Sequence, residues 1–398
     1  KFFLNFLFFS LDLFVFFICF ELILLPLFLL ISRFGSQYLF FLPRLEAAYR
    51  FFFYTFIGSL LMLLSIILFY IKYGSSSNEL LNFSLGGLDF GIPSLFFFFQ
   101  LSWFFLFFSF LIKIPMFPFY SWLPYAHSDA PTSGSVLLAG IILKLGSFGI
   151  LRYSLYIYNP IIFGYNKNLS HIYDYFLPLI FICSYISIIL CSLIALRSLF
   201  DLKKIIAFSS IVHMNFSIFG FFSNDSVGLF GSTFLMFSHA FISSALFLLV
   251  GFLYKRFHTR FLLYFRGLFN LLPLFSFFFL FFVFANLSLP FCSSFLAEFF
   301  ILFSTFSFNP FLSLFLLLSL FFSTLFFLYF TQRILFGSLS PYIQGALRIP
   351  KVYGRESLLS SSDTNHWLDT PSPHSGDEGH HKMVSPSVKT LGVSQKTG

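Results

Sequence analysis

The segment Lys113–Arg152, KIPMFPFYSWLPYAHSDAPTSGSVLLAGIILKLGSFGILR, decides the fold. It begins where the apolar run Ser94–Ile112 ends, and a group of three prolines follows at once: Pro115, Pro118 and Pro124. Because proline interrupts a helix, these residues predict a break in a membrane helix. The next apolar run, Ser133–Leu151, carries Lys144 seven residues before its end. Discontinuous helices that meet at mid-membrane are common in membrane transporters.

The composition of the whole chain excludes a soluble fold. Of 398 residues, 58% are hydrophobic and 10% are charged, and the mean hydropathy is +0.90. Soluble proteins contain about 25% charged residues, so this chain has too little polar surface to cover itself in water. Most apolar runs are roughly 18 to 27 residues long, enough to cross a bilayer as a helix. The sequence predicts an all-α polytopic transmembrane bundle of about 9–10 spans.

Nine apolar elements are expected as helices. The predicted ranges are Phe6–Ile31, Phe51–Ile71, Ser94–Ile112, Ser133–Leu151, Phe176–Leu199, Ile205–Phe222, Gly228–Tyr254, Leu272–Phe306 and Phe311–Phe330. The eighth is too long for one straight span and contains Asn286 and Pro290, which predicts a second broken helix. Paired discontinuous helices favour two inverted repeats. We assign the first, N-terminally shortened repeat to residues 1–152 and the second to 176–337.

The loop charges and the C-terminal composition predict an orientation. The net charge is +8, and ten basic loop residues fall on one predicted face against three on the other. By the positive-inside rule the richer face is cytoplasmic or matrix. Residues 338–398 contain no Phe and many Ser, Gly and Pro, which indicates a polar tail on that same face or, alternatively, a strap over partner subunits. We expect no metal at His374, His380 and His381, and none in the tail.

Cysteine usage and the N-terminus add two expectations. The four cysteines lie far apart in or beside apolar runs, with no metal-ligand spacing and no disulfide framework. We therefore expect no metal or redox centre in this chain. No signal peptide is visible, and the chain begins at Lys1 rather than Met, so an N-terminal part is expected to be absent or processed away.

Six ionisable residues lie within apolar runs. They are Glu21, Lys113, Lys144, His213, His239 and Glu298. Each is costly at mid-membrane, by about 2.5–3.5 kcal/mol for a charged side chain, and so is a functional candidate. Singly, each also has a structural explanation: a lysine that reaches the headgroups, a packing histidine or an ion pair. Together they resemble a proton relay, because burial and a switchable carboxylate partner move a lysine pKa in opposite directions.

The same residues lie in motifs that resemble a known family. The quoted segment is similar to the signature of the antiporter-like subunits of respiratory complex I. Further stretches fit in order: ELILLPLFLLISRFG, AAYRFFFYTFIGSLLML, DLKKIIAFSSIVHMNFSIFGFFS, LMFSHAFISSALFLLVGFLYKRFHTR and ANLSLPFCSSFLAEF. The resemblance covers about residues 10–337. It implies a fold of fourteen transmembrane helices, in which two five-helix units form inverted repeats. The family's four leading helices are missing from this sequence, and the polar tail stands in place of its last helix.

The resemblance also implies roles. Glu21 and Lys113 correspond to the family's paired glutamate and lysine, Lys144 to its central lysine, and Glu298 to the distal ionisable residue of the second broken helix. His213 and His239 match polar positions along the central axis, whereas Tyr120 stands where the family has a histidine.

The expected function is therefore proton translocation in the membrane arm of NADH:ubiquinone oxidoreductase. FMN, iron–sulfur clusters, NADH and ubiquinone are expected in other subunits. Expected partners are other membrane-arm subunits (antiporter-like subunits 2 and 5), lipids, and a separate chain that supplies the missing helices; nucleic acid is not expected. The expected location is the mitochondrial inner membrane, or alternatively a bacterial or other energy-converting membrane. Two alternatives remain open: a subunit of a multi-subunit Na⁺/H⁺ antiporter, and a non-pumping membrane scaffold.

Overall fold

The computed structural model describes residues 2–35, 42–78, 81, 93–155, 170–197 and 201–343. All the described residues fall in one compact unit, 1–349. Most of the predicted polar tail, including the three histidines at 374, 380 and 381, lies outside the described residues. The division into repeats at 1–152 and 176–337 and the face of the tail stay predictions.

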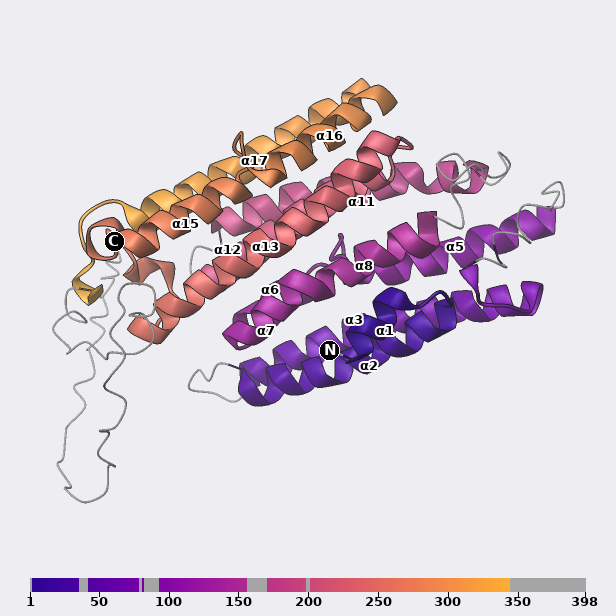
Figure 1. Ribbon diagram of the computed structural model, residues 1–398, viewed down its shortest axis with the longest axis horizontal. Helices are drawn as coiled ribbons and strands as arrows, with labels where there is room; N and C mark the ends of the chain where they lie inside the picture. The colour runs from indigo at the N-terminus through magenta and orange to yellow at the C-terminus, as the bar shows by residue number, and fades with distance from the viewer. Residues whose placement is uncertain are drawn as a thin grey trace, which may run out of the picture. The chain divides into compact units, whose positions relative to one another are not determined.

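Figure 1 shows a bundle of helices lying roughly along one direction. The helices before residue 160 are α1 (Phe2–Phe9), α2 (Leu13–Phe34), α3 (Leu42–Tyr73), α5 (Pro93–Lys113), α6 (Trp122–Asp129), α7 (Thr132–Leu137) and α8 (Leu143–Gly149). Two π-helical turns, η1 (Leu138–Ile142) and η2 (Ile150–Leu155), flank α8. The segments from α7 to η2 run on as one apolar span, Thr132–Leu155.

The remaining helices form the second half of the bundle. They are α11 (Ser170–Arg197), α12 (Leu202–Phe221), α13 (Ser226–Phe257), the short turns η4 (Leu262–Tyr264) and α14 (Leu268–Leu271), α15 (Pro273–Asn286), α16 (Ser293–Phe308) and α17 (Pro310–Leu335). Nearly every residue of α12 is buried, because α11, α13, α16 and α6 pack around it. The central helix of this half is therefore the one that carries His213.

Among the described residues, seven helices are long and apolar enough to cross a membrane. Three shorter apolar helices accompany them: Gln100–Lys113, Pro273–Asn286 and Ser293–Phe308. The last two confirm the predicted break in Leu272–Phe306. The prediction of a polytopic all-α bundle is likewise confirmed.

The first predicted span was wrong at its start. Phe6–Ile31 is not one helix: α1 ends at Phe9 and α2 begins at Leu13. Ser10 and Asp12 lie between these two helices, and each forms a polar interaction. The Ser10 hydroxyl donates to the carbonyl of Leu7 at 2.8 Å, and the backbone of Asp12 bridges that of Ser77. Two polar residues close together thus end one helix and start another.

Candidate functional site

Three hydrogen bonds hold the break between α5 and α6, and two of them involve side chains of other helices. The Trp122 indole donates to the carbonyl of Ile112 at 3.0 Å, the Asn215 amide to that of Pro115 at 3.2 Å, and the backbone N–H of Phe117 to the Ser187 hydroxyl at 2.7 Å. Irregular backbone at membrane depth is tolerated only where protein or water satisfies its polar groups. Side chains of α11 and α12 therefore keep this break in place.

The break between α15 and α16 uses its own residues. The Ser294 hydroxyl donates to the carbonyl of Ala285 across the break. Ser288 and Phe291 adopt positive φ angles of 54° and 76°, on either side of Pro290. Few non-glycine residues take up this conformation. The chain therefore turns sharply here, and α16 begins five residues before Glu298.

Lys144 lies between two π-helical turns. Its ammonium donates to the carbonyl of Ala139, which belongs to the preceding turn η1. A π-turn widens a helix locally and often occurs at a functional position. Here it offers a backbone carbonyl to an ammonium that is only 7% exposed. No pattern in the sequence predicts these turns.

Four of the six predicted residues form one continuous buried row. The Lys144 Nζ lies 3.0 Å from the Nδ1 of His239, and the rings of His239 and His213 lie 5.5 Å apart between centroids. The His213 Nδ1 then lies 3.1 Å from the Glu298 Oε1, within ion-pair distance. All four side chains are buried. The row begins on α8 in the first half and crosses α13 and α12 to reach α16 in the second.

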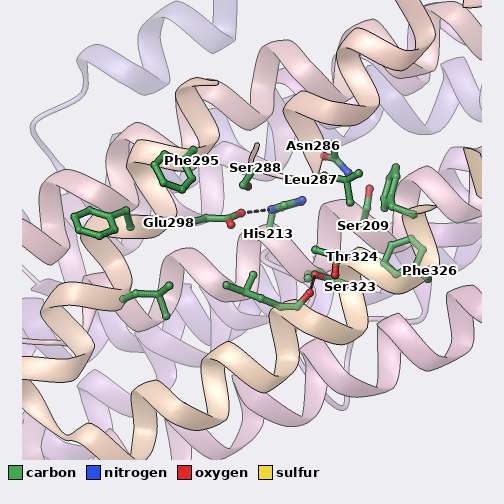
Figure 2. Close-up of a pocket in the computed structure, with 15 residues that line it drawn as sticks. Ser209, His213, Asn286, Leu287, Ser288, Phe295, Glu298, Ser323, Thr324 and Phe326 are labelled. Carbon is green, nitrogen blue, oxygen red and sulfur yellow. Dashed lines mark hydrogen bonds and ion pairs between the residues drawn. The ribbon is translucent and has the colours of Figure 1, made fainter. Parts of the chain in front are cut away.

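A cavity of about 200 Å³ lies at the Glu298 end of the row. Figure 2 shows the carboxylate of Glu298 and the ring of His213 joined by a dashed line and surrounded by the residues that line this cavity. Its polar lining residues come from α12, the second break and α17: Ser209, Asn286, Ser288, Ser323 and Thr324. A cavity of this size with several polar groups has room for water. The acidic end of the row therefore borders a space that water can occupy.

Glu21 and Lys113 lie apart from that row. Lys113 is 1% exposed, and its ammonium lies 4.2 Å from the ring centroid of Phe20, the neighbour of Glu21 on α2. Neither the Lys113 Nζ nor the Glu21 Oε1 has a hydrogen-bond partner in the described part of the chain. The charge of Glu21 nevertheless acts on Lys113. The expected pair is thus an electrostatic neighbour pair rather than a direct salt bridge.

Lys113 is joined to the helix of Lys144 by packing. A Cβ on Gly146 would lie 3.2 Å from the Cβ of Lys113 and 2.7 Å from the Cγ1 of Ile114. Only glycine leaves room for the end of α5 at this point. The absence of a side chain on α8 therefore sets how closely the two lysine-bearing helices approach.

Sequence reasoning missed His127. It lies on α6, is completely buried, and its ring stacks on that of Phe247 with 4.6 Å between centroids. Neither ring nitrogen has a hydrogen-bond partner among the described residues. Lys144 and Lys203 both act on it electrostatically, and it acts on His239. The sequence does contain a signal for it: a histidine inside the short polar stretch YAHSD, directly after the break between α5 and α6.

The structure also describes Tyr120. Tyr120, which stands in the family's histidine position, is half-buried in the first break. Within the described ranges, no group of three or more His, Cys, Asp or Glu side chains could hold a metal ion.

Two broken helices and a buried row of Lys, His and Glu define the class of antiporter-like membrane subunits. The family described as NADH:quinone oxidoreductase/Mrp antiporter, TM, matches residues 10–325. The chain belongs to this family, which confirms the resemblance found in the sequence.

Within the family, the chain is most informatively compared with NADH-ubiquinone oxidoreductase chain 4. It is 45% identical to that of Chondrus crispus over 329 residues, which are 83% of this chain and 62% of the relative. It is 42% identical to that of Marchantia polymorpha over 350 residues, 88% of this chain and 66% of the relative. The chain thus spans about three fifths to two thirds of the length of these curated relatives.

Solved structures share the fold. Respiratory complex I from Thermus thermophilus with bound NADH contains a chain with a TM-score of 0.71 and 26% identity; the match covers 85% of this chain and 69% of that one. A chain of the Mrp complex from Dietzia sp. DQ12-45-1b reaches a TM-score of 0.74 at 20% identity, covering 85% of this chain and 60% of that one. The second likeness concerns the fold alone.

Proposed function

We propose that this chain is a proton-translocating membrane-arm subunit of NADH:ubiquinone oxidoreductase. The observation that carries the proposal is the row from Lys144 to Glu298, in which four buried ionisable side chains follow one another within one bundle. Burying such groups is costly and is seldom seen without a functional reason. The similarity to chain 4 sequences supports a role of this row in complex I.

The proton moves stepwise along the row. The Lys144 ammonium gives a proton to the Nδ1 of His239, 3.0 Å away. The His239 Nε2 is buried and has no hydrogen-bond partner among the described residues, so the second nitrogen of the ring is free to pass a proton toward His213. His213 then protonates the carboxylate of Glu298 at 3.1 Å. The bordering cavity takes the proton from Glu298 to water.

Glu21 and Lys113 act as the control element. The face of Phe20 stabilises the Lys113 cation without taking up its charge. When Glu21 moves closer, the pair is neutralised; when it moves away, an uncompensated cation remains beside the helix of Lys144. That cation favours loss of the proton from Lys144, because like charges disfavour each other at short range. Coupling from a neighbouring subunit would act by changing this separation.

The magnitudes permit a pump. Moving one charge against 100 mV requires about 2.3 kcal/mol. One unit of pKa corresponds to about 1.4 kcal/mol, so a swing of about two units along the row is enough. Buried groups with switchable neighbours reach swings of that size.

The redox chemistry belongs elsewhere in the complex. We assign FMN, the iron–sulfur clusters, NADH and ubiquinone to other subunits, and place this chain in the membrane arm beside antiporter-like subunits 2 and 5, in the mitochondrial inner membrane.

The Na⁺/H⁺ antiporter alternative has weaker support. The likeness to the Mrp complex is at 20% identity and bears on the fold only, whereas the likeness to NADH-ubiquinone oxidoreductase chain 4 reaches 45%. A non-pumping scaffold would not need a continuous row of ionisable groups.

Isolation of the intact complex in mild detergent tests the proposal. Mass spectrometry should identify flavin and iron–sulfur subunits that co-purify with this chain. In liposomes, the complex should acidify the lumen with NADH and ubiquinone, at the same rate when choline replaces Na⁺. The absence of redox subunits, or proton movement that requires Na⁺, would contradict it.

A further inference from the structure

The end of α6 is held by two buried cations from the second half of the bundle. The Arg260 guanidinium, 1% exposed, donates to the carbonyl of Ser128. The Lys203 ammonium, 2% exposed, donates to the carbonyl of Ala130 at 2.7 Å. Cations are favourable at the carboxyl end of a helix, where the last carbonyls lack partners. Structural capping explains two cations here, but it does not require one of them to be a lysine.

A cavity of about 240 Å³ opens beside this helix end. Its charged lining residues come from α3, α6, the start of α12 and the segment after α13: Glu46, Arg50, Asp129, Asp201, Lys204 and Arg260. Tyr125 completes it, with Arg50 at 4.4 Å and Lys204 at 5.0 Å from its ring centroid. This is the predicted basic face, so the cavity lies on the side from which a positive-inside subunit would take up protons.

Asp129 is the acid of this cavity that lies on α6. It is half-buried at the end of α6 and accepts a hydrogen bond from the Ser128 hydroxyl at 3.2 Å. Burial raises the pKa of Asp129, and Asp201 raises it further, while the cations Arg260 and Lys204 act in the opposite direction. Glu46 and Arg50 face the same cavity from α3 as a mutual ion pair.

Electrostatic interactions between ionisable groups link the cavity to the row. Asp129 and Lys203 interact electrostatically, and Lys203 in turn acts on His127, two residues before Asp129 on α6. His127 interacts with both Lys144 and His239, the first two members of the row. Since His127 has two unpartnered nitrogens among the described residues, it can both accept a proton and donate one.

We propose that Asp129 and Lys203 form the proton-uptake site of this chain, which loads Lys144 from the cavity on the basic face. A carboxylate oxygen of Asp129 takes a proton from water in the cavity and forms an O–H bond. That bond breaks as the neutral amine of Lys203 gains the proton, and His127 relays it to the neutral amine of Lys144. The site thus regains its carboxylate after each transfer. This inference rests on the proposed function and names the entrance to its row.

The substitution Lys203→Arg separates proton transfer from capping. Arginine keeps the cation and its bond to the carbonyl of Ala130, but it does not release a proton at physiological pH. The test uses the intact complex in liposomes, with NADH-driven proton uptake followed across pH. We expect Lys203→Arg to slow uptake about tenfold or more, since a positioned proton-transfer group typically contributes about 10²–10⁴-fold. An unchanged rate in an assembled complex would overturn the proposal and leave a structural cap.

The substitution Asp129→Asn tests the acid end, with Asp129→Glu and added formate as rescues. We expect Asn to slow uptake about tenfold or more, mainly at alkaline pH, where free protons are scarce. Glu, or formate entering the cavity, should restore it. Asp225→Asn is the matched control, since Asp225 caps α13 at the opposite end of α12, and it should leave uptake unchanged. A loss of proton uptake in Asp129→Asn that is restored neither by formate nor in Asp129→Glu would also overturn the proposal.

Lys144→Ala in the same assay distinguishes a failure of this uptake site from a failure of the proposed function. If Lys144→Ala stops pumping while Lys203→Arg and Asp129→Asn do not, the row stands and only this entrance fails. If Lys144→Ala pumps normally, the proposed function itself fails.

Discussion

The ammonium of Lys144 lies 3.0 Å from the Nδ1 of His239. This contact joins α8, in the first half of the bundle, to α13 in the second half. The same ammonium donates to the carbonyl of Ala139 in the π-helical turn η1. An ammonium that is held by a carbonyl and faces a histidine nitrogen can lose its proton without leaving its place. The two halves of the bundle are therefore joined at the point where we propose proton transfer.

His239→Gln should lower the number of protons that the complex moves per NADH. A glutamine amide keeps a polar group near Lys144 but cannot take up and release a proton. Stoichiometry measured as protons moved per NADH in liposomes should fall, while the complex still assembles. A fully coupled His239→Gln complex would show that the histidine serves packing only.

Glu298→Gln should block release at the end of the row. The amide cannot accept a proton from His213, so turnover coupled to pumping should fall by about 10²-fold if this step becomes rate-limiting. Glu298→Asp keeps a carboxylate at the cavity and should recover part of the activity. If Gln and Asp behave alike, the carboxylate is not the releasing group.

Gly146→Ala should destabilise the contact between α5 and α8. The added Cβ would lie 2.7 Å from the Cγ1 of Ile114 and 3.3 Å from the backbone nitrogen of Ile114. Overpacking of this kind costs about 1–3 kcal/mol. Gly140→Ala is the control, because nothing lies within 4 Å of the Cβ it would add. Thermal inactivation of pumping should occur at a lower temperature in the first variant only. Equal inactivation temperatures would contradict this packing account.

Ser294→Ala should loosen the second broken helix. It leaves the buried carbonyl of Ala285 without the hydroxyl that satisfies it, at a cost of about 1–3 kcal/mol. Ser307→Ala is the control, since that exposed hydroxyl bonds only to the carbonyl of Ser304 in its own helix. We expect faster hydrogen exchange of amides near the break in Ser294→Ala alone. Unaltered exchange there would mean that Pro290 and the flanking backbone hold the break.

The sequence predicted the features that depend on local chemistry. Proline clusters and Asn286–Pro290 predicted both breaks, and isolated charges in apolar runs identified Lys144 and Glu298, because each is unusual in its own segment. The assembly of these residues into one row followed only by resemblance, since it requires the packing of α8, α12, α13 and α16.

Other features could not be predicted, for physical reasons. The π-turns around Lys144 occur in residues that equally favour an α-helix. The boundary between α1 and α2 depends on Asp12 meeting Ser77, which is distant in sequence. His127 lies in a stretch too short and polar to show a helical period. The position of the Lys113 ammonium over the ring of Phe20, beside Glu21, depends on how α2 packs against α5.

The most direct test of proton transfer along the buried row is the number of protons moved per NADH by the complex that carries Lys144→Ala. Lys72→Ala, a lysine exposed at the end of α3, is the control and should leave the number unchanged. The account predicts that Lys144→Ala assembles and yields a lower number. An assembled Lys144→Ala complex that moves as many protons per NADH as the unmodified one would contradict it.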